Sequence, residues 1–291
     1  MKTRALLWGA LIASAPALSD TAPWFEDNTP LTQAHKHLLN NNLSGMFSSL
    51  VEVWQLESTS NLSSHLNSLL LQSLEVDCGK GLDTNPTPTW ISSVVIRRTN
   101  IESPGRDAFR AIVEVDSEKP IRDIALTQWV SRNISTDNTL TKLPGNENGL
   151  SKYIKRYNLN SRLPMGLYRL DVTAADQSSW SAWVLLGEPN AAIDVRWKSK
   201  DEWSIDRTAL LNPHCPLPKL ETGIYDYVDG KYNQIWTEVH VSDFPTALKP
   251  NVVPAGRYVL AVSINQQRWQ GPIIVEQSQI ISKTYDVSVE E

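Results

Sequence analysis

The chain has 291 residues, in which 27 Lys and Arg stand against 32 Asp and Glu, so its formal net charge is −5. This acidic balance lacks the basic footprint that nucleic-acid binding needs, so we expect no nucleic-acid partner. The length exceeds one typical β-sandwich and fits two or three domains. The 11 tryptophans are most simply core residues, because Trp buries a large area, with a sugar-stacking platform as the alternative.

The N-terminus has the features of a secretory signal peptide. Lys2 and Arg4 precede an apolar stretch at 5–15 that is too short to span a bilayer. We expect cleavage after Ala17 or Ser19, which leaves a periplasmic protein without a membrane span. A membrane anchor is the alternative, but the chain turns polar directly after this stretch and has no second apolar segment.

The next segment, residues 20–82, is expected to hold about three short helices. Thr29-Pro30 is a helix start, with Thr at the N-cap and Pro at the first helical position. Apolar residues within 43–54 follow the spacing of an amphipathic helix, and leucines repeat this spacing within 62–74. A Cys-Gly-Lys-Gly sequence then ends the last helix, since glycine is a common helix stop.

Beyond the helices, alternating apolar residues predict strands in two groups. The first group lies at 90–98, 108–115, 121–130, 166–173 and 180–186, and the second at 193–197, 223–228, 231–241, 257–264, 273–275 and about 280–289. Asp229-Gly230 predicts a tight hairpin within the second group. The predicted division is signal peptide 1–19, helical segment 20–82, first β-sandwich 83–188 with a long insertion 131–163, and second β-sandwich 189–291.

One nine-residue pattern, Pro-x-Gly-x-Tyr-x-Leu-x-Val, occurs at 164–172 and again at 254–262. In a strand it places Tyr, Leu and Val on one face. A Tyr near the start of such a strand is typical of the tyrosine corner of immunoglobulin-like sandwiches. We therefore predict a mainly β chain with an N-terminal α-helical segment and two tandem immunoglobulin-like β-sandwiches, in which Tyr168 and Tyr258 are equivalent.

The insertion 131–163 has little strand pattern, and loops of this length are usually functional or disordered. It is basic within an acidic protein, and 149–157 could form a short basic helix. We take it as a candidate interaction surface for an acidic partner or an anionic envelope polymer, with a solvated insertion as the alternative. Its candidate residues are Lys142, Lys152, Lys155, Arg156 and Arg162.

Two cysteines, Cys78 and Cys215, remain in a chain that is expected to be exported. An even number in an oxidising compartment favours one disulfide, which would tie the helical segment to the second sandwich. Two separate buried thiols are the alternative. The sequence contains no His-Glu-x-x-His or Cys-x-x-Cys metal motif, no Gly-x-Ser-x-Gly and no phosphate-binding loop. We therefore predict no catalytic residue, no metal and no cofactor.

The signal peptide, the Leu-rich helices ending at Cys78 and the repeated motif together resemble a family of uncharacterised exported proteins of Gram-negative bacteria. The resemblance implies a fold and transfers no catalytic motif. We expect a non-enzymatic periplasmic protein–protein interaction, assembly or accessory factor of the cell envelope, with an envelope protein as its partner. The alternative is a glycan- or peptidoglycan-binding module that uses exposed Trp, and a hydrolase of unrecognised type comes third.

Overall fold

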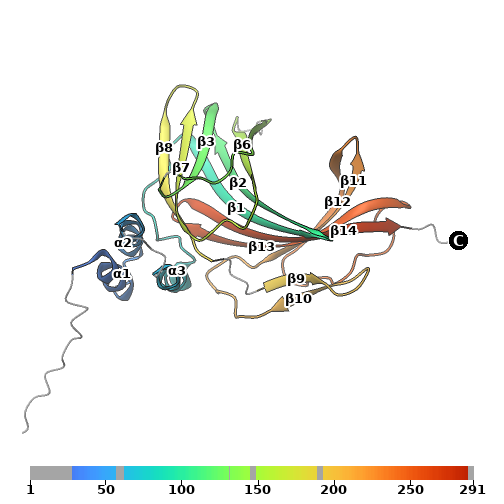
Figure 1. Ribbon diagram of the computed structural model, residues 1–291, viewed down its shortest axis with the longest axis horizontal. Helices are drawn as coiled ribbons and strands as arrows, with labels where there is room; N and C mark the ends of the chain where they lie inside the picture. The colour runs from blue at the N-terminus through green and yellow to red at the C-terminus, as the bar shows by residue number, and fades with distance from the viewer. Residues whose placement is uncertain (1–27, 57–61, 131, 145–148, 189–192, 288–291) are drawn as a thin grey trace, which may run out of the picture.

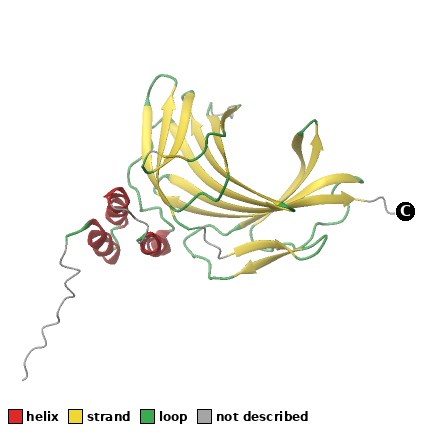
Figure 2. Ribbon diagram, viewed as in Figure 1, coloured by secondary structure: helices red, strands yellow, loops and turns green. Residues whose placement is uncertain are grey.

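A computed structural model describes residues 28–56, 62–130, 132–144, 149–188 and 193–287 (Figure 1). Three helices gather at one end, and strands make up most of the rest (Figure 2). The prediction of a mainly β chain with an N-terminal helical segment is thus confirmed. The predicted signal peptide, 1–19, lies outside the described residues.

The helical segment contains α1 (Pro30–Leu39), α2 (Leu43–Leu56) and α3 (Ser63–Asp77). As predicted, Thr29 caps α1: its hydroxyl accepts from the Thr32 amide, and the Thr32 hydroxyl accepts from the Thr29 amide. Such reciprocal capping satisfies two amides that the first helical turn leaves free. Leu50 and Leu66 belong to a buried cluster that also contains Leu167, so the helices bury their apolar stripes against the β-structure.

The strands form three sheets. The eight-stranded sheet has the order β12-β11-β13-β14-β1-β2-β6-β5, the four-stranded sheet β4-β3-β7-β8, and the two-stranded sheet β10-β9. All neighbours are antiparallel except β1 and β14, which are parallel. The strands are β1 (Ile91–Ser103), β2 (Arg106–Ser117), β3 (Ile121–Gln128), β4 (Arg132–Asn133), β5 (Asn138–Leu143), β6 (Ser151–Leu159), β7 (Gly166–Ala174), β8 (Ser179–Leu186), β9 (Ile193–Trp197), β10 (Trp203–Arg207), β11 (Lys219–Val228), β12 (Lys231–His240), β13 (Gly256–Gln270) and β14 (Ile273–Val287).

Two apolar cores lie on the same face of the eight-stranded sheet. One core is covered by the four-stranded sheet and the other by β9–β10. On β13, Leu260 and Ile264 face the second core, while Gln270 reaches the four-stranded sheet. Since these positions are separated by even numbers along one unbroken strand, their side chains share a face. The repeat predicts two separate sandwiches, but the structure has one curved sheet that runs through both cores.

The predicted boundary at 188–189 adjoins residues outside the described part, so the domain division stays a prediction. The repeated motif, in contrast, has the expected local structure. The Tyr168 hydroxyl donates to the Pro164 carbonyl (2.6 Å), and the Tyr258 hydroxyl donates to the Pro254 carbonyl (3.1 Å). The Leu and Val of both copies are buried. The two copies lie in different sheets, the first in β7 and the second in β13.

The segment 131–163 is largely built into the sheet rather than looped out. β6 pairs with β2 on one side and with β5 on the other, so 151–159 is a strand and not the basic helix that the sequence allows. The Tyr157 hydroxyl accepts from the Leu126 amide (2.9 Å) and donates to the Ile124 carbonyl (3.1 Å). These two bonds join β6 to β3 across the first core.

The two tyrosine corners allow a matched comparison. Tyr168→Phe should lower the free energy of unfolding by about 1–3 kcal/mol, because a hydrogen bond is lost at a buried site. Tyr258→Phe should cost less, because its hydroxyl bond lies at the surface. Urea unfolding of both variants measures the difference. An equal loss, or a larger loss at Tyr258, would contradict this assignment.

Candidate functional site

A row of polar residues interrupts the apolar face of the large sheet between its two cores. We call it the polar belt. In the strand register Arg98 lies beside Gln277, Gln277 beside Gln266, and Asn100 beside Gln279. Such a row is unexpected on a core-facing surface, because buried polar groups cost free energy unless they are paired. The belt consists of Arg98, Asn100, Gln266, Arg268, Gln277 and Gln279.

Two glutamines of the large sheet, Gln270 and the belt residue Gln279, form hydrogen bonds with strands of the two covering sheets. The Gln270 amide accepts from the Leu185 amide (2.9 Å) and donates to the Trp183 carbonyl (2.7 Å), which holds β8. The Gln279 amide accepts from the Val195 amide (3.1 Å) and donates to its carbonyl (3.3 Å), which holds β9. Each side chain thus extends the hydrogen bonding of a strand in another sheet.

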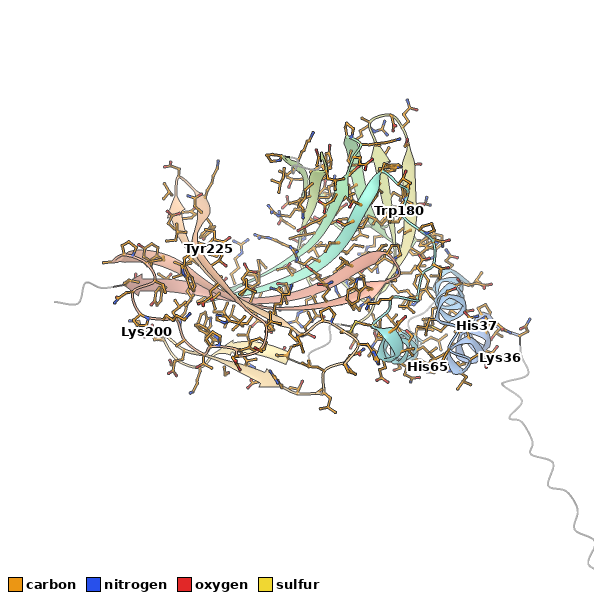
Figure 3. All side chains as sticks on the ribbon, turned by 180° about the vertical axis from the view of Figure 1, so that it is seen from behind. Lys36, His37, His65, Trp180, Lys200 and Tyr225 are labelled. Carbon is orange, nitrogen blue, oxygen red and sulfur yellow. A yellow bond between two sulfur atoms is a disulfide. The ribbon has the colours of Figure 1, made fainter. Side chains whose placement is uncertain are left out.

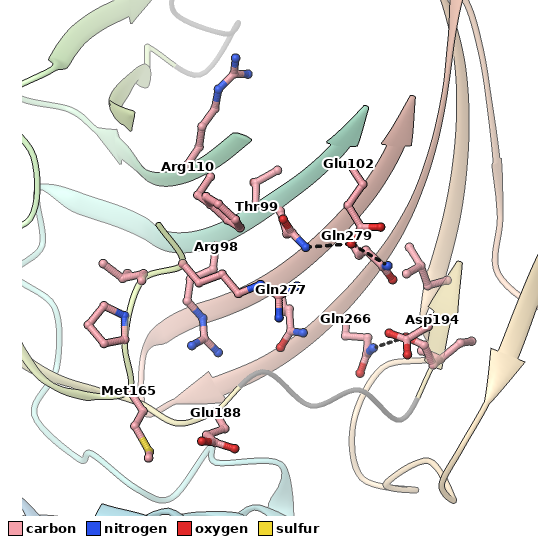
Figure 4. Close-up of a pocket in the computed structure, with 17 residues that line it drawn as sticks. Arg98, Thr99, Glu102, Arg110, Met165, Glu188, Asp194, Gln266, Gln277 and Gln279 are labelled. Carbon is pink, nitrogen blue, oxygen red and sulfur yellow. Dashed lines mark hydrogen bonds between the residues drawn. The ribbon is translucent and has the colours of Figure 1, made fainter. Parts of the chain in front are cut away.

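A cavity of about 450 Å³ lies over the belt. In Figure 4, Arg98, Gln277 and Gln266 lie next to one another across neighbouring strands, with Met165 and Glu188 across from them. Arg98 Nε and Asn100 Oδ1 are buried and have no hydrogen-bond partner in the described structure. Unsatisfied buried polar atoms are rare in native proteins, so their presence at one cavity marks it as a binding-site candidate.

Two arginines of the belt carry charge into this interior. Arg98 donates to the Gly187 carbonyl (2.7 Å), and Arg268 donates to the Leu185 carbonyl (2.8 Å). Burial lowers the pKa of Arg98 to about 10. Burial, and then repulsion from Arg98, lowers the pKa of Arg268 to about 9. Within the described residues neither guanidinium forms an ion pair. The hydrogen bonds given above join both guanidinium groups to carbonyl oxygens, which carry no charge.

A second cavity, of about 530 Å³, shares four lining residues with the first, Arg98, Glu188, Gln266 and Gln277. Its walls are leucines of α3 and the proline-rich segment 210–218. The Cys78–Cys215 disulfide, with Cα atoms 5.1 Å apart, fastens this segment to the end of α3. The predicted disulfide is therefore confirmed, and it holds one wall of this cavity in place.

The five predicted interaction residues do not share one surface. Lys155 forms an ion pair with Asp123 (3.0 Å), on the side of β6 that faces β3. Lys152 lies near Glu114 (3.4 Å) on the opposite side of the strand, and the neighbouring Arg156 is exposed. Lys142 lies on β5 opposite Tyr153, on the same face of the sheet as Lys155, and its Nζ is 5.7 Å from the Tyr153 ring centre. Arg162 lies apart from these residues and lines the first cavity. Sequence spacing alone did not reveal this separation.

The described tryptophans are buried or half-buried, and Trp203 is fully buried. The paired rings meet edge to face: Trp129 and Trp183 at 83°, and Trp197 and Trp203 at 82°. A sugar-stacking platform needs exposed rings that lie parallel to the sugar face. Among the described residues, no arrangement of tryptophans therefore favours the glycan-binding alternative.

The hairpin of β11 and β12 leaves one edge of the large sheet open. Its turn has the predicted form, with φ of 52° at Asp229 and 77° at Gly230. Among the described strands none pairs with the outer side of β12. Several large apolar side chains of this hairpin and the residue after it are exposed, namely Tyr227, Val228, Tyr232, Ile235, Val239 and Val241. We call this region the open edge.

The helical end carries a histidine contact that the sequence did not predict. His35 Nε2 and His65 Nε2 are 2.9 Å apart and join α1 to α3. His37, two residues on, contacts Asn42 instead (3.0 Å), and Figure 3 shows His37 and His65 at the helical end. Figure 3 also places Tyr225, on β11, at the opposite end of the molecule. No cluster of three or more metal-ligating His, Cys, Asp or Glu side chains occurs in the described ranges. None of the helices described is long and apolar enough to cross a membrane.

Comparison with protein families gives a match that covers most of the chain. The family described as "Protein of unknown function (DUF2861)" matches residues 24–286, which include every described helix and nearly all of the described strands. The chain belongs to this family. A comparison with curated proteins found no match. The site is therefore interpreted from its own geometry.

The disulfide makes a stability prediction. Replacing Cys78 and Cys215 together by Ser should lower the free energy of unfolding by about 2–5 kcal/mol, because the bond closes a loop with a sequence separation of 137. Urea unfolding measures the loss, and reduction of the wild-type protein should reproduce it. Thiol titration of the denatured, unreduced protein should find no free thiol. Two free thiols per chain would contradict the assignment.

Proposed function

We propose that this protein is a non-enzymatic, periplasmic interaction factor of the cell envelope that binds an extended segment of another protein at the open edge. The observation that carries the proposal is β12, an edge strand whose outer backbone groups face no other described strand. An unpaired edge is a template for strand addition, in which main-chain hydrogen bonds supply affinity. Export and envelope location rest on the N-terminal sequence.

The side chains of the open edge favour a neutral, partly apolar partner segment. Native proteins usually protect long edge strands with charges, prolines or bulges. Here a bulge occurs where Ile224 and Tyr225 face Trp236 and Gln234, which leaves Ile235 as the extra residue. Beyond the bulge, 236–240 is regular, and its one acidic residue, Glu238, forms an ion pair with Lys249 (2.6 Å). The regular stretch is therefore close to neutral.

The protein-interaction role has better geometric support than the glycan alternative. The open edge provides backbone groups that pair with no described strand, beside exposed apolar side chains, whereas the described tryptophans are buried or half-buried. An extended peptide can use both features of the edge. Its alternate side chains would contact residues such as Tyr232 and Val239 while its backbone pairs with β12.

Photo-crosslinking in the source cell tests this proposal. A photoreactive residue at Val239 should join the protein to one continuous segment of a single envelope protein, identified by mass spectrometry. Ile235→Lys should abolish the crosslink, because a charge at an edge opposes strand addition. Val130→Lys changes an exposed apolar residue that follows β3, a strand of a different sheet from β12, and should leave the crosslink intact. The same experiment should find the mature N-terminus after residue 17 or 19.

Three results would overturn the proposal. A crosslink that joins β12 only to β12 of a second copy would show that the edge serves self-assembly. A crosslink that survives Ile235→Lys, or that disappears equally in Val130→Lys, would show that the contact does not depend on the edge.

A further inference from the structure

The two belt arginines pose an electrostatic problem that the protein does not solve with its own described carboxylates. Burying a charge is costly unless the charge is paired, and two buried like charges repel each other. Carbonyls of Leu185 and Gly187 accept bonds from Arg268 and Arg98 but carry no charge. Arg98 Nε remains without a partner although it is buried beside the cavity. An anion that enters the cavity would satisfy this donor and offset the repulsion.

Four carboxylates, those of Glu75, Glu102, Glu188 and Asp194, also line the two cavities. Glu102 is already a hydrogen-bond acceptor for Asn100 (3.1 Å). Glu188 is exposed, and neither it nor Glu75 or Asp194 forms an ion pair with an arginine in the described ranges. Acidic groups around a pair of buried arginines disfavour a highly charged ligand through repulsion. The acidic groups therefore favour a ligand whose head group carries a low negative charge.

The second cavity adds an apolar extension to this arginine end. Leu70 and Leu74 of α3 line it on one side, and Leu211 and the prolines of 210–218 line it on the other. Three leucines that also line it are exposed to solvent: Leu71 by 39%, Leu217 by 55% and Leu210 by 99%. Exposed apolar side chains that surround a cavity are typical of a ligand or partner site. The cavity is thus polar and cationic at one end and apolar at the other.

We propose that the joined cavities bind an amphipathic anion, with a carboxylate or phosphate head at Arg98 and Arg268 and an apolar chain along α3 and 210–218. Arginine suits such a head because its planar fork of donors matches both groups. The amides of Gln266 and Gln277 lie next to the arginines and line both cavities. The two volumes fall within the range of about 300–1,000 Å³ that is usual for small-molecule sites. This site is separate from the open edge and does not depend on it.

The test uses the full mature protein and a fluorescent long-chain fatty acid as the probe. Unlabelled palmitate and a lysophosphatidic acid should each displace it, whereas hexadecanol, which has a chain but no charge, should compete at least about tenfold more weakly. The reason is that a hydrogen bond to a charged group contributes about 1.5–3 kcal/mol, and 1.4 kcal/mol is tenfold in affinity. Stronger competition by palmitate indicates a fatty acid, and stronger competition by lysophosphatidic acid indicates a phosphate-headed lipid.

Variants locate the site. Arg98→Gln and Arg268→Gln should each weaken probe binding at least about tenfold. Arg156→Gln removes an exposed arginine from β6, outside both cavities, and should not change binding. Leu74→Trp, which fills the apolar end, should reduce binding without altering the arginines, so a failure of the arginine variants to fold leaves the site testable. Absence of probe binding to the wild type would overturn the proposal. So would equal competition by hexadecanol, or equal binding by the Arg98 and Arg156 variants.

Discussion

The parallel pairing of β1 with β14 is the constraint on which the architecture depends. Nine residue pairs, from Val94–Ile273 to Glu102–Ile281, join the first described strand to the last. Without this seam, β2, β6 and β5 would have no connection to β13, β11 and β12, and the eight-stranded sheet would divide into two sheets. Arg97 reinforces the seam from the other face, since it forms ion pairs with Glu114 of β2 (3.0 Å) and Glu276 of β14 (2.6 Å).

Local patterns in the sequence predicted local structure well. The Thr29 cap, the three helices, the hairpin turn at Asp229 and the two tyrosine corners all depend on residues within a few positions of each other. The disulfide was also predictable, because only two cysteines were available to pair. Each of these features follows from the chemistry of a short segment or of a single pair.

The polar belt explains why the sequence did not predict one continuous large sheet. The apolar alternation used to recognise strands stops at Arg98, at Asn265 and again after Val275. The expected strands were ended at these points, although β1, β13 and β14 all continue through them. Because the interruptions align only across the folded sheet, in the sequence they resembled strand ends. Polar residues of the belt line the cavity of the candidate site. The same residues interrupt the apolar pattern from which a continuous sheet could have been predicted.

The seam also has a consequence for how the chain reaches its native state. Arg97 and Glu276 are 179 residues apart in sequence, so bringing them together closes a long loop and costs conformational entropy. Folds rich in contacts between residues far apart in sequence form slowly, because conformational entropy is lost before those contacts can stabilise the structure. Until residues 273–281 are present, β1 has an unpaired edge, which is a site for wrong pairing with other chains. Truncation at the C-terminus would therefore damage the N-terminal half of the sheet as well as the half from which the residues were removed.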